Sequence, residues 1–143
     1  PHVMVASKAY IARAGAPATP EELESHAIVA FGGRGRHVGW GLVPVGGGEA
    51  VRVNLRPGLS TNDYSTLTEA VRAGLGIGEL PTILSGEVAS LVRVLPEWTL
   101  GEVSLHALFA ADRLLSRAVR AVLEAIVARV PRELEKRAGA LGA

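Results

Sequence analysis

The residue types that most often support enzyme chemistry are scattered along this chain of 143 residues. The chain has four histidines, which are His2, His26, His37 and His106. They show no spacing typical of metal ligands, and a structural or surface role explains them better. No serine lies in a G-x-S-x-G motif, there is no cysteine, and neither lysine follows a glycine-rich loop that could hold phosphate. The sequence therefore predicts no catalytic residue, no metal site and no cofactor.

A series of glycines superficially resembles a dinucleotide-binding fingerprint. The three residues are Gly74, Gly76 and Gly78. They follow a predicted helix and precede a predicted strand, whereas the fingerprint needs the strand first and the helix after it. The series therefore does not indicate a nucleotide site.

A loop at residues 32–36 combines glycines with arginines. Gly32 and its neighbouring glycines leave backbone N–H groups free, and Arg34 and Arg36 add two guanidinium groups, so the loop could bind an anion. A solvated connection between two strands explains the same residues. Both interpretations remain open at this point.

The strongest candidate for ligand binding is the turn formed by Thr61, Asn62, Asp63 and Tyr64. The residues after it repeat at the spacing of one apolar helix face, which consists of Leu67, Ala70, Val71 and Leu75. Short polar side chains before a helix accept bonds from its unpaired first-turn N–H groups, and Gly74 suits the end of that helix. Helix capping is therefore a complete alternative explanation of Asn62 and Asp63.

The neighbouring strands support a ligand role for this turn. In open α/β sheets, ligands bind beyond the carboxyl ends of strands and near helix N-termini. A predicted strand at residues 51–55 leads into the turn, and a second one at residues 77–81 brings Leu80 and Pro81 to the same edge through a standard crossover. Spacing alone does not separate ligand binding from capping.

Strands alternate with helices along the chain, which predicts an α/β layered fold. Predicted strands cover residues 2–6, 28–31, 40–45, 51–55, 77–81, 91–95 and 103–109. Predicted helices cover residues 7–14, 20–25, about 64–73, 83–86 and 116–130, and residues 96–98 are predicted to form a turn.

Two of these helices carry clear end signals. Thr19 is placed to cap the second helix, Pro20 occupies its first turn, and Glu22 completes a capping box. Ser116 is placed to cap the last helix, whose apolar stripe consists of Val119, Val122, Leu123, Ile126, Val127 and Val130. We expect Pro131 to end or interrupt this helix and the tail after it to fray.

The composition limits the class of protein. A hydrophobic content of 48% suffices for the core of one domain, and a net charge of +1 gives no strong field for nucleic acid or a membrane. No apolar stretch is long enough to span a membrane, and no signal peptide is visible. The missing initiator Met and the immediate strand suggest a fragment, and the absence of cysteine is compatible with the cytoplasm.

Three blocks of the chain, in order, resemble segments of LysR-type transcriptional regulators. The first is VMVASKAYIARAGAPATPEELESHAIVAF, which looks like the family segment ASPAYL…G.P..P.DL..H. The second is TNDYSTLTEAVRAGLGIGELP, which resembles ND…L..A…G.GI..LP, and the third is the closing block LVRVLPEWTLGEVSLHALFAADRLLSRAVRAVLEAI. The resemblance covers about residues 3–127. It departs from the family at Lys8, where proline is usual, and at Ala110 and Ala111, where a tyrosine or histidine followed by proline is common.

The resemblance implies the effector-binding module of such a regulator, with an α/β fold like that of type 2 periplasmic binding proteins. One complete lobe and part of the second would be present. Residues 2–95 would form the second lobe, residues 96–130 the return strand and helix of the first lobe, and residues 131–143 a flexible tail. The winged helix-turn-helix domain has no match, so this chain is not expected to bind DNA by itself.

The effector site implied by the resemblance consists of Thr61, Asn62, Asp63 and Tyr64, with Leu80 and Pro81 across from them, and Gly32 and Arg34 in the loop after Phe31. Asn62 would contact the carboxylate of a small-molecule effector, while Asp63 would cap the helix or select a hydroxyl or amine. Effector binding would shift the lobes, and contacts in a homodimer or higher oligomer would pass the change to DNA-binding domains in the cytoplasm. No membrane partner and no enzymatic activity are expected.

Two alternatives to this function remain open. One is a solute-binding protein of the same fold, and the other is a dimerisation module with a degenerate cleft. The apolar stripe of the last helix would lose its packing partners in a fragment, which predicts dimerisation, domain swapping or poor solubility.

Overall fold

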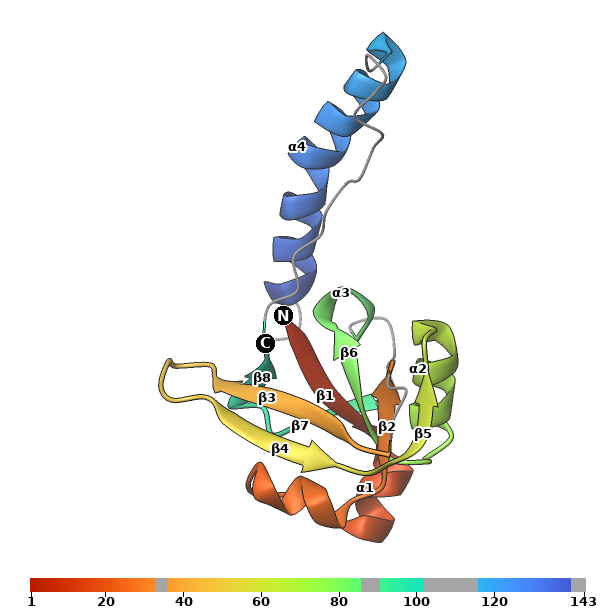
Figure 1. The fold of residues 1–143 in the computed structure, drawn as a ribbon, viewed down its shortest axis with the longest axis vertical. Coiled ribbons are helices and arrows are strands. Elements are labelled where there is room, and N and C mark those ends of the chain that lie inside the picture. Colours follow the sequence, from red (N-terminus) through yellow and green to blue (C-terminus); the bar gives the residue numbers. More distant parts are fainter. Residues whose placement is uncertain (33–35, 86–90, 102–115, 140–143) are drawn as a thin grey trace. The chain divides into compact units, whose positions relative to one another are not determined.

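The computed structural model of the chain describes residues 1–32, 36–85, 91–101 and 116–139 (Figure 1). The chain divides into two compact units, Pro1–Glu102 and Val103–Ala143. The predicted strand at residues 103–109 lies outside the described residues, and the predicted division between lobes at residue 95 stays a prediction. The first unit contains the candidate site.

Most of the predicted elements are present in the structure. The strands are β1 (His2–Ser7), β2 (Ile28–Phe31), β3 (Val38–Pro44), β4 (Val51–Leu55), β5 (Pro57–Thr61), β6 (Ile77–Pro81), β7 (Leu91–Val94) and β8 (Trp98–Leu100). The helices are α1 (Lys8–Ala14), a 3₁₀ helix (Glu21–Ser25), α2 (Tyr64–Arg72), α3 (Thr82–Ser85) and α4 (Arg117–Gly139). None of the helices in these ranges is long and apolar enough to cross a membrane.

These eight strands form one mixed sheet in the first unit (Figure 1). Its order is β4-β3-β8-β1-β6-β2-β5, with β7 also paired to β1. β2 runs parallel to both β5 and β6, whereas β1 pairs antiparallel with β6, β7 and β8. β2, β5 and β6 therefore point in one direction and end at the same edge of the sheet.

Two apolar clusters form the core of the first unit. Successive residues of a strand point to opposite faces, so Val3 and Val5 of β1 belong to one cluster and Met4 and Ala6 to the other. The first of these clusters is the core beneath α2 and also contains Val29, Leu67, Ala70, Val71 and Leu80. The other contains residues of β3, β4 and the first two helices.

α2 packs closely on β6. Its predicted apolar face is correct for Leu67, Ala70 and Val71, which are buried, but Leu75 is 56% exposed and does not belong to that face. The helix ends before Leu75 because Gly74 adopts a φ of +79°, the left-handed conformation that terminates helices. A Cβ on Gly78 would lie 2.5 Å from Val71 Cγ2, so only glycine permits this separation of helix and strand.

Two strands were not predicted from the sequence. Residues 57–61 form β5, although Pro57 and Gly58 are typical of a turn, because β5 lies at the edge of the sheet where a missing N–H is tolerated. The second unpredicted strand is β8. Its first residue, Trp98, was predicted to lie in the turn at residues 96–98 but instead pairs with Pro44 of β3.

The predicted capping box at residues 19–22 is wrong. Pro20 occupies the N-cap of a short 3₁₀ helix, and no side chain bonds to the first turn in the way expected of Thr19. Glu22 does reach backwards, but its Oε2 accepts a 2.7 Å hydrogen bond from the backbone N–H of Ala18. The hydrogen bond from Glu22 back to the chain is therefore present, but its donor is the N–H of Ala18 and not that of Thr19.

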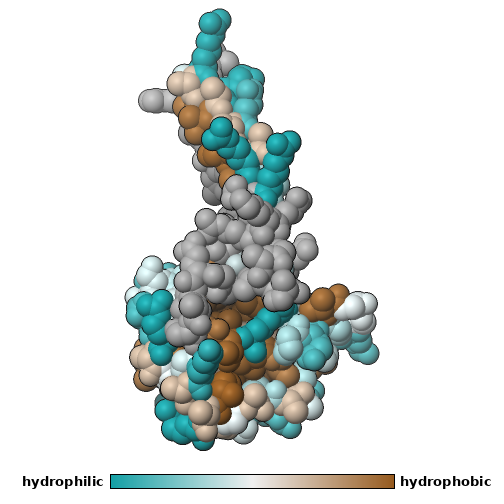
Figure 2. All heavy atoms as spheres, turned by 180° about the vertical axis from the view of Figure 1, so that it is seen from behind, coloured by the Kyte–Doolittle hydropathy of each residue, from teal (hydrophilic) through white to brown (hydrophobic). Residues whose placement is uncertain are grey.

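The second unit is described only by α4. Ser116 caps it as predicted, since its Oγ accepts a 3.3 Å bond from the N–H of Val119. The helix continues past Pro131 to Gly139, so Pro131 does not end it; the predicted fraying of the tail stays a prediction. The predicted stripe is largely exposed, with Val127 71% exposed, and Figure 2 shows apolar side chains gathered along this helix.

Candidate functional site

The carboxyl ends of β5, β2 and β6 bring together the segments that the sequence analysis singled out (Figure 1). Phe31 at the end of β2 is aligned with Thr61 at the end of β5. The chain continues from there into Gly32, whose N–H donates a 2.7 Å hydrogen bond to the Thr61 carbonyl. The strand that leads into the turn is therefore β5, not the predicted strand at residues 51–55, and the predicted meeting at one edge is correct.

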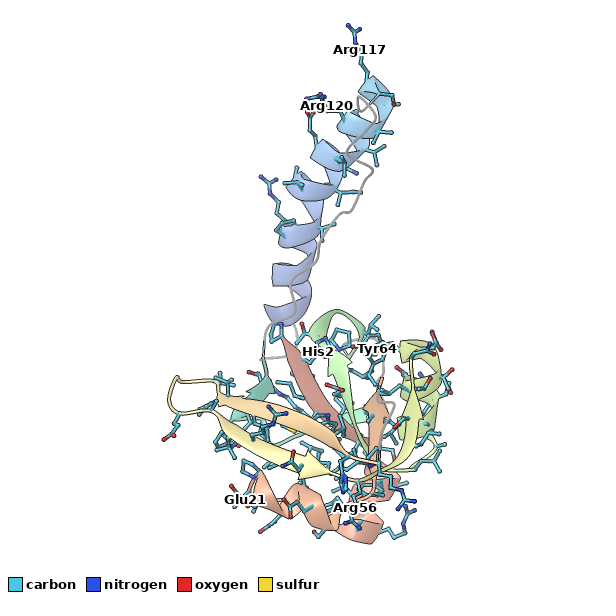
Figure 3. All side chains as sticks on the ribbon, viewed as in Figure 1. His2, Glu21, Arg56, Tyr64, Arg117 and Arg120 are labelled. Carbon is cyan, nitrogen blue, oxygen red and sulfur yellow. The ribbon has the colours of Figure 1, made fainter. Side chains whose placement is uncertain are left out.

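An aromatic cluster covers this edge. The rings of Phe31 and Tyr64 stack with their centroids 3.9 Å apart and an interplanar angle of 11°. The His2 ring meets Tyr64 edge-on at 5.8 Å, and His2 is paired in the sheet with Pro81 (Figure 3). Tyr64 thus links the first turn of α2 to the ends of β2, β1 and β6.

Asp63 is the N-cap of α2, as the capping interpretation requires. Its Oδ2 accepts 2.7 Å hydrogen bonds from both the backbone N–H and the side-chain hydroxyl of Thr66. These two bonds, with a weaker contribution from the Ser65 N–H, hold the pKa of Asp63 below its usual range. Part of the N-terminus of α2 is therefore already occupied by a side chain of the protein.

The other predicted site residues differ in how they could reach a ligand. Asn62 is exposed, and its side chain makes no hydrogen bond to the described residues. Thr61 is half-buried, and its Oγ1 accepts a 3.2 Å bond from the Asp63 N–H. The Leu80 side chain is fully buried in the core beneath α2, away from the edge, while Arg34 lies outside the described residues.

Two half-buried polar residues at this edge were not among the predicted site residues: Glu79, and His2, to which the sequence analysis gave a structural or surface role. His2 Nδ1 lies 3.7 Å from Glu79 Oε2, and their side chains are 14% and 13% exposed. Burial raises the pKa of Tyr64, and the negative charge of Glu79 raises it further. The sequence did contain a signal for Glu79, because it is a charged residue in the middle of the otherwise apolar segment Ile77–Pro81. A charged residue in a buried strand is unusual and therefore informative.

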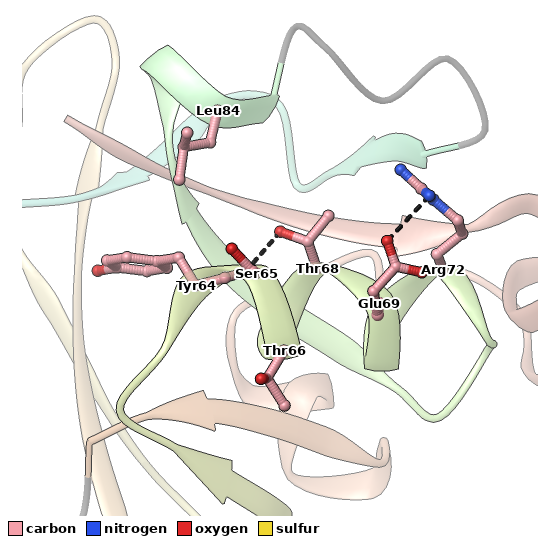
Figure 4. A pocket seen from close by; sticks show the side chains of 7 residues that line it. All are labelled: Tyr64, Ser65, Thr66, Thr68, Glu69, Arg72 and Leu84. Atoms are coloured by element: carbon pink, nitrogen blue, oxygen red, sulfur yellow. Dashed lines mark hydrogen bonds and ion pairs between the residues drawn. The ribbon is translucent and has the colours of Figure 1, made fainter.

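A shallow hollow of about 570 Å³ runs along α2 beside this edge (Figure 4). It is lined by Tyr64, Ser65, Thr66, Thr68, Glu69, Arg72 and Leu84. Thr68 Oγ1 donates to the Tyr64 carbonyl at 2.7 Å, and Glu69 pairs with Arg72 at 2.9 Å, so the protein itself satisfies much of the polar lining. Of the predicted site residues, Tyr64 alone lines this hollow.

The described residues of the site suit binding rather than catalysis. No group of three or more His, Asp or Glu side chains in the described ranges could hold a metal ion. The edge offers an exposed amide, a half-buried carboxylate, an imidazole and aromatic rings. These groups can form hydrogen bonds and apolar contacts with a small molecule.

Replacing Asp63 with Ala tests the N-cap. Because the folded-state pKa of Asp63 lies below the unfolded value, its charge stabilises the fold above about pH 4 and loses that effect as the pH falls through the folded pKa. We expect Asp63→Ala to lower the melting temperature at pH 7, with a difference from wild type that narrows towards pH 3. Asp63→Asn keeps a capping oxygen without the charge, so it should melt between Asp63→Ala and wild type at pH 7. Equal melting of all three proteins at pH 7 would contradict the cap.

The chain is similar to transcriptional regulators over most of its length. It is 31% identical over 138 residues to the probable HTH-type transcriptional regulator LtrA of Klebsiella pneumoniae, covering 91% of this chain and 43% of that protein. It is 36% identical over 136 residues to an HTH-type transcriptional regulator of Xanthomonas campestris pv. campestris, covering 87% of this chain and 38% of that protein. The chain therefore spans about two fifths of the length of these relatives.

Solved structures agree with this similarity. The regulatory domain of AphB from Vibrio vulnificus, treated with cumene hydroperoxide, matches with a TM-score of 0.67 and 25% identity, over 89% of this chain and 63% of that one. The regulatory domain of CrgA, a LysR-type regulator from Neisseria meningitidis, shares the fold with a TM-score of 0.69 and 23% identity, over 90% and 64% of the two chains. The predicted α/β fold, like that of type 2 periplasmic binding proteins, is thus confirmed. The family model described as the LysR substrate binding domain matches residues 1–131 of the sequence. The chain therefore belongs to this family of regulator domains, which is not a family of enzymes.

Proposed function

We propose that this chain senses a small carboxylate effector at the carboxyl edge formed by β5, β2 and β6. The observation that carries the proposal is the meeting of Gly32, Thr61, Tyr64 and Pro81 at that edge, next to the exposed side chain of Asn62, which bonds to none of the described residues. Ligands of open α/β sheets bind beyond such strand ends. Membership of the LysR substrate-binding family supports an effector as the ligand.

The Asn62 amide is the donor best placed for the effector carboxylate. Asp63 already accepts the N–H of Thr66, and its negative charge opposes a second carboxylate at the same point of the helix. The free amide of Asn62, one residue earlier, carries no charge and can donate two hydrogen bonds. Effector binding therefore depends on Asn62, and the stability of α2 depends on Asp63.

The response of the whole regulator is allosteric in this proposal. The effector lies between two lobes and favours one arrangement of them, and contacts between subunits pass the change to DNA-binding domains. DNA would be bound in the cytoplasm through a winged helix-turn-helix domain outside this chain. The names of the relatives, which are HTH-type transcriptional regulators, support this arrangement.

Replacing Asn62 with Ala tests effector binding. The melting temperature of the chain is measured against a panel of aromatic and aliphatic carboxylates. A ligand at about 100 times its dissociation constant adds roughly 2.7 kcal/mol of stability, which raises the melting temperature by several degrees. We expect at least one saturable shift in the wild type, its loss in Asn62→Ala, and its retention in Asn54→Ala, which changes an exposed asparagine of β4. A shift that survives Asn62→Ala would contradict the assigned contact.

We further propose that the chain assembles as a homodimer through the apolar stripe of α4, whose exposed members include Val119, Val122 and Ile126. The double variant Val119→Lys, Ile126→Lys adds two charges to the stripe and should sediment as a monomer at concentrations where the wild type is dimeric. Ala121→Lys with Ala128→Lys adds the same charges, at the same spacing, to the opposite side of the helix and should leave the dimer intact. A monomeric wild type, or two variants that behave alike, would contradict this interface.

A further inference from the structure

Glu79 is an unusual residue for its position in the fold. It lies in β6 between the buried residues Gly78 and Leu80, and its side chain is only 13% exposed. Among the described residues it accepts no hydrogen bond, and its one charged neighbour is the His2 imidazole. A carboxylate that accepts no hydrogen bond from the protein is available to a donor supplied by a ligand.

A structural ion pair with His2 does not meet this requirement. The 3.7 Å between His2 Nδ1 and Glu79 Oε2 exceeds hydrogen-bond length, and the imidazole carries a positive charge only when it is protonated. His2 also packs edge-on against Tyr64, which holds its ring beside Glu79 without a hydrogen bond between them. The Glu79 carboxylate therefore keeps its capacity to accept bonds.

The surroundings of Glu79 favour a cationic donor. Tyr64 contacts the His2 ring that lies beside Glu79, and it stacks on Phe31 at 3.9 Å. An ammonium group gains from a carboxylate and from the face of an aromatic ring, particularly where water is partly excluded. Asn62, the donor assigned to the effector carboxylate, lies only two residues before Tyr64. The proposed carboxylate donor therefore lies near the same aromatic residue as Glu79.

We propose that Glu79 is a specificity-determining residue that selects effectors carrying an amino group in addition to a carboxylate. The ammonium group pairs with Glu79 beside the Tyr64 ring, and the carboxylate bonds to Asn62. The ligand class is therefore a zwitterionic amino carboxylate. This inference rests on the proposed effector site and adds the second polar group that the site recognises.

Matched pairs of probes test the inference by isothermal titration of the 143-residue chain. Each pair has one carbon skeleton with and without the amino group: phenylalanine with 3-phenylpropanoate, and leucine with 4-methylpentanoate. The proteins are wild type, Glu79→Gln, and Glu69→Gln, which changes an exposed carboxylate of α2 paired with Arg72. Gln keeps the shape of the side chain and removes its charge.

We expect the wild type to bind the amino member of at least one pair about tenfold more tightly than its partner. Glu79→Gln should remove most of that preference, and Glu69→Gln should preserve it. An equal or tighter affinity for the deamino member, or a preference unchanged in Glu79→Gln, would overturn the inference while leaving the proposed carboxylate site in place. Binding of no probe at all would contradict the proposed function as well.

The melting temperature of the free chain gives a second readout. Because Glu79 has no hydrogen-bond partner among the described residues, Glu79→Gln should melt at the wild-type temperature or above it. A clear fall in melting temperature would show that Glu79 stabilises the fold through His2, and that result would overturn the inference without any ligand.

Discussion

The close packing of α2 on β6 is the constraint on which the site depends. Leu67 and Val71 approach Gly78 so closely that a Cβ there would force the Val71 side chain or the helix to shift. The helix therefore lies directly on the parallel strands β5, β2 and β6, and its first turn shares an edge with their carboxyl ends. A helix held further from the sheet would separate Tyr64 from Phe31 and His2.

The polar groups at this edge divide into those that the fold uses and those that it leaves free. Asp63 is committed to the first turn of α2 through Thr66. Asn62 remains exposed, and Glu79 is largely buried without a hydrogen bond from the described residues. Protein sites that bind small molecules combine an apolar surface with a few free polar groups in this way. The edge is consequently suited to a ligand with both a donor and an acceptor.

Local signals in the sequence predicted the framework of this site correctly. Asp63 and Gly74 mark the two ends of α2 through short-range hydrogen bonding and backbone conformation, which depend on neighbouring residues alone. The edge strand β5 was missed because Pro57 and Gly58 are typical of turns, and sheet pairing outweighs that preference. The contact between His2 and Glu79 depends on the register of β1 with β6, which no local pattern specifies.

The central claim is that an effector binds at the carboxyl edge of the first unit. Amide chemical shifts of the isotope-labelled chain, recorded while phenylalanine is added, test it most directly. The proposed site predicts that the largest shifts occur at Gly32, Asn62 and Glu79, which three separate segments bring to one edge. Shifts concentrated instead at Thr68, Glu69 and Arg72 would place the ligand in the hollow along α2 and contradict the site.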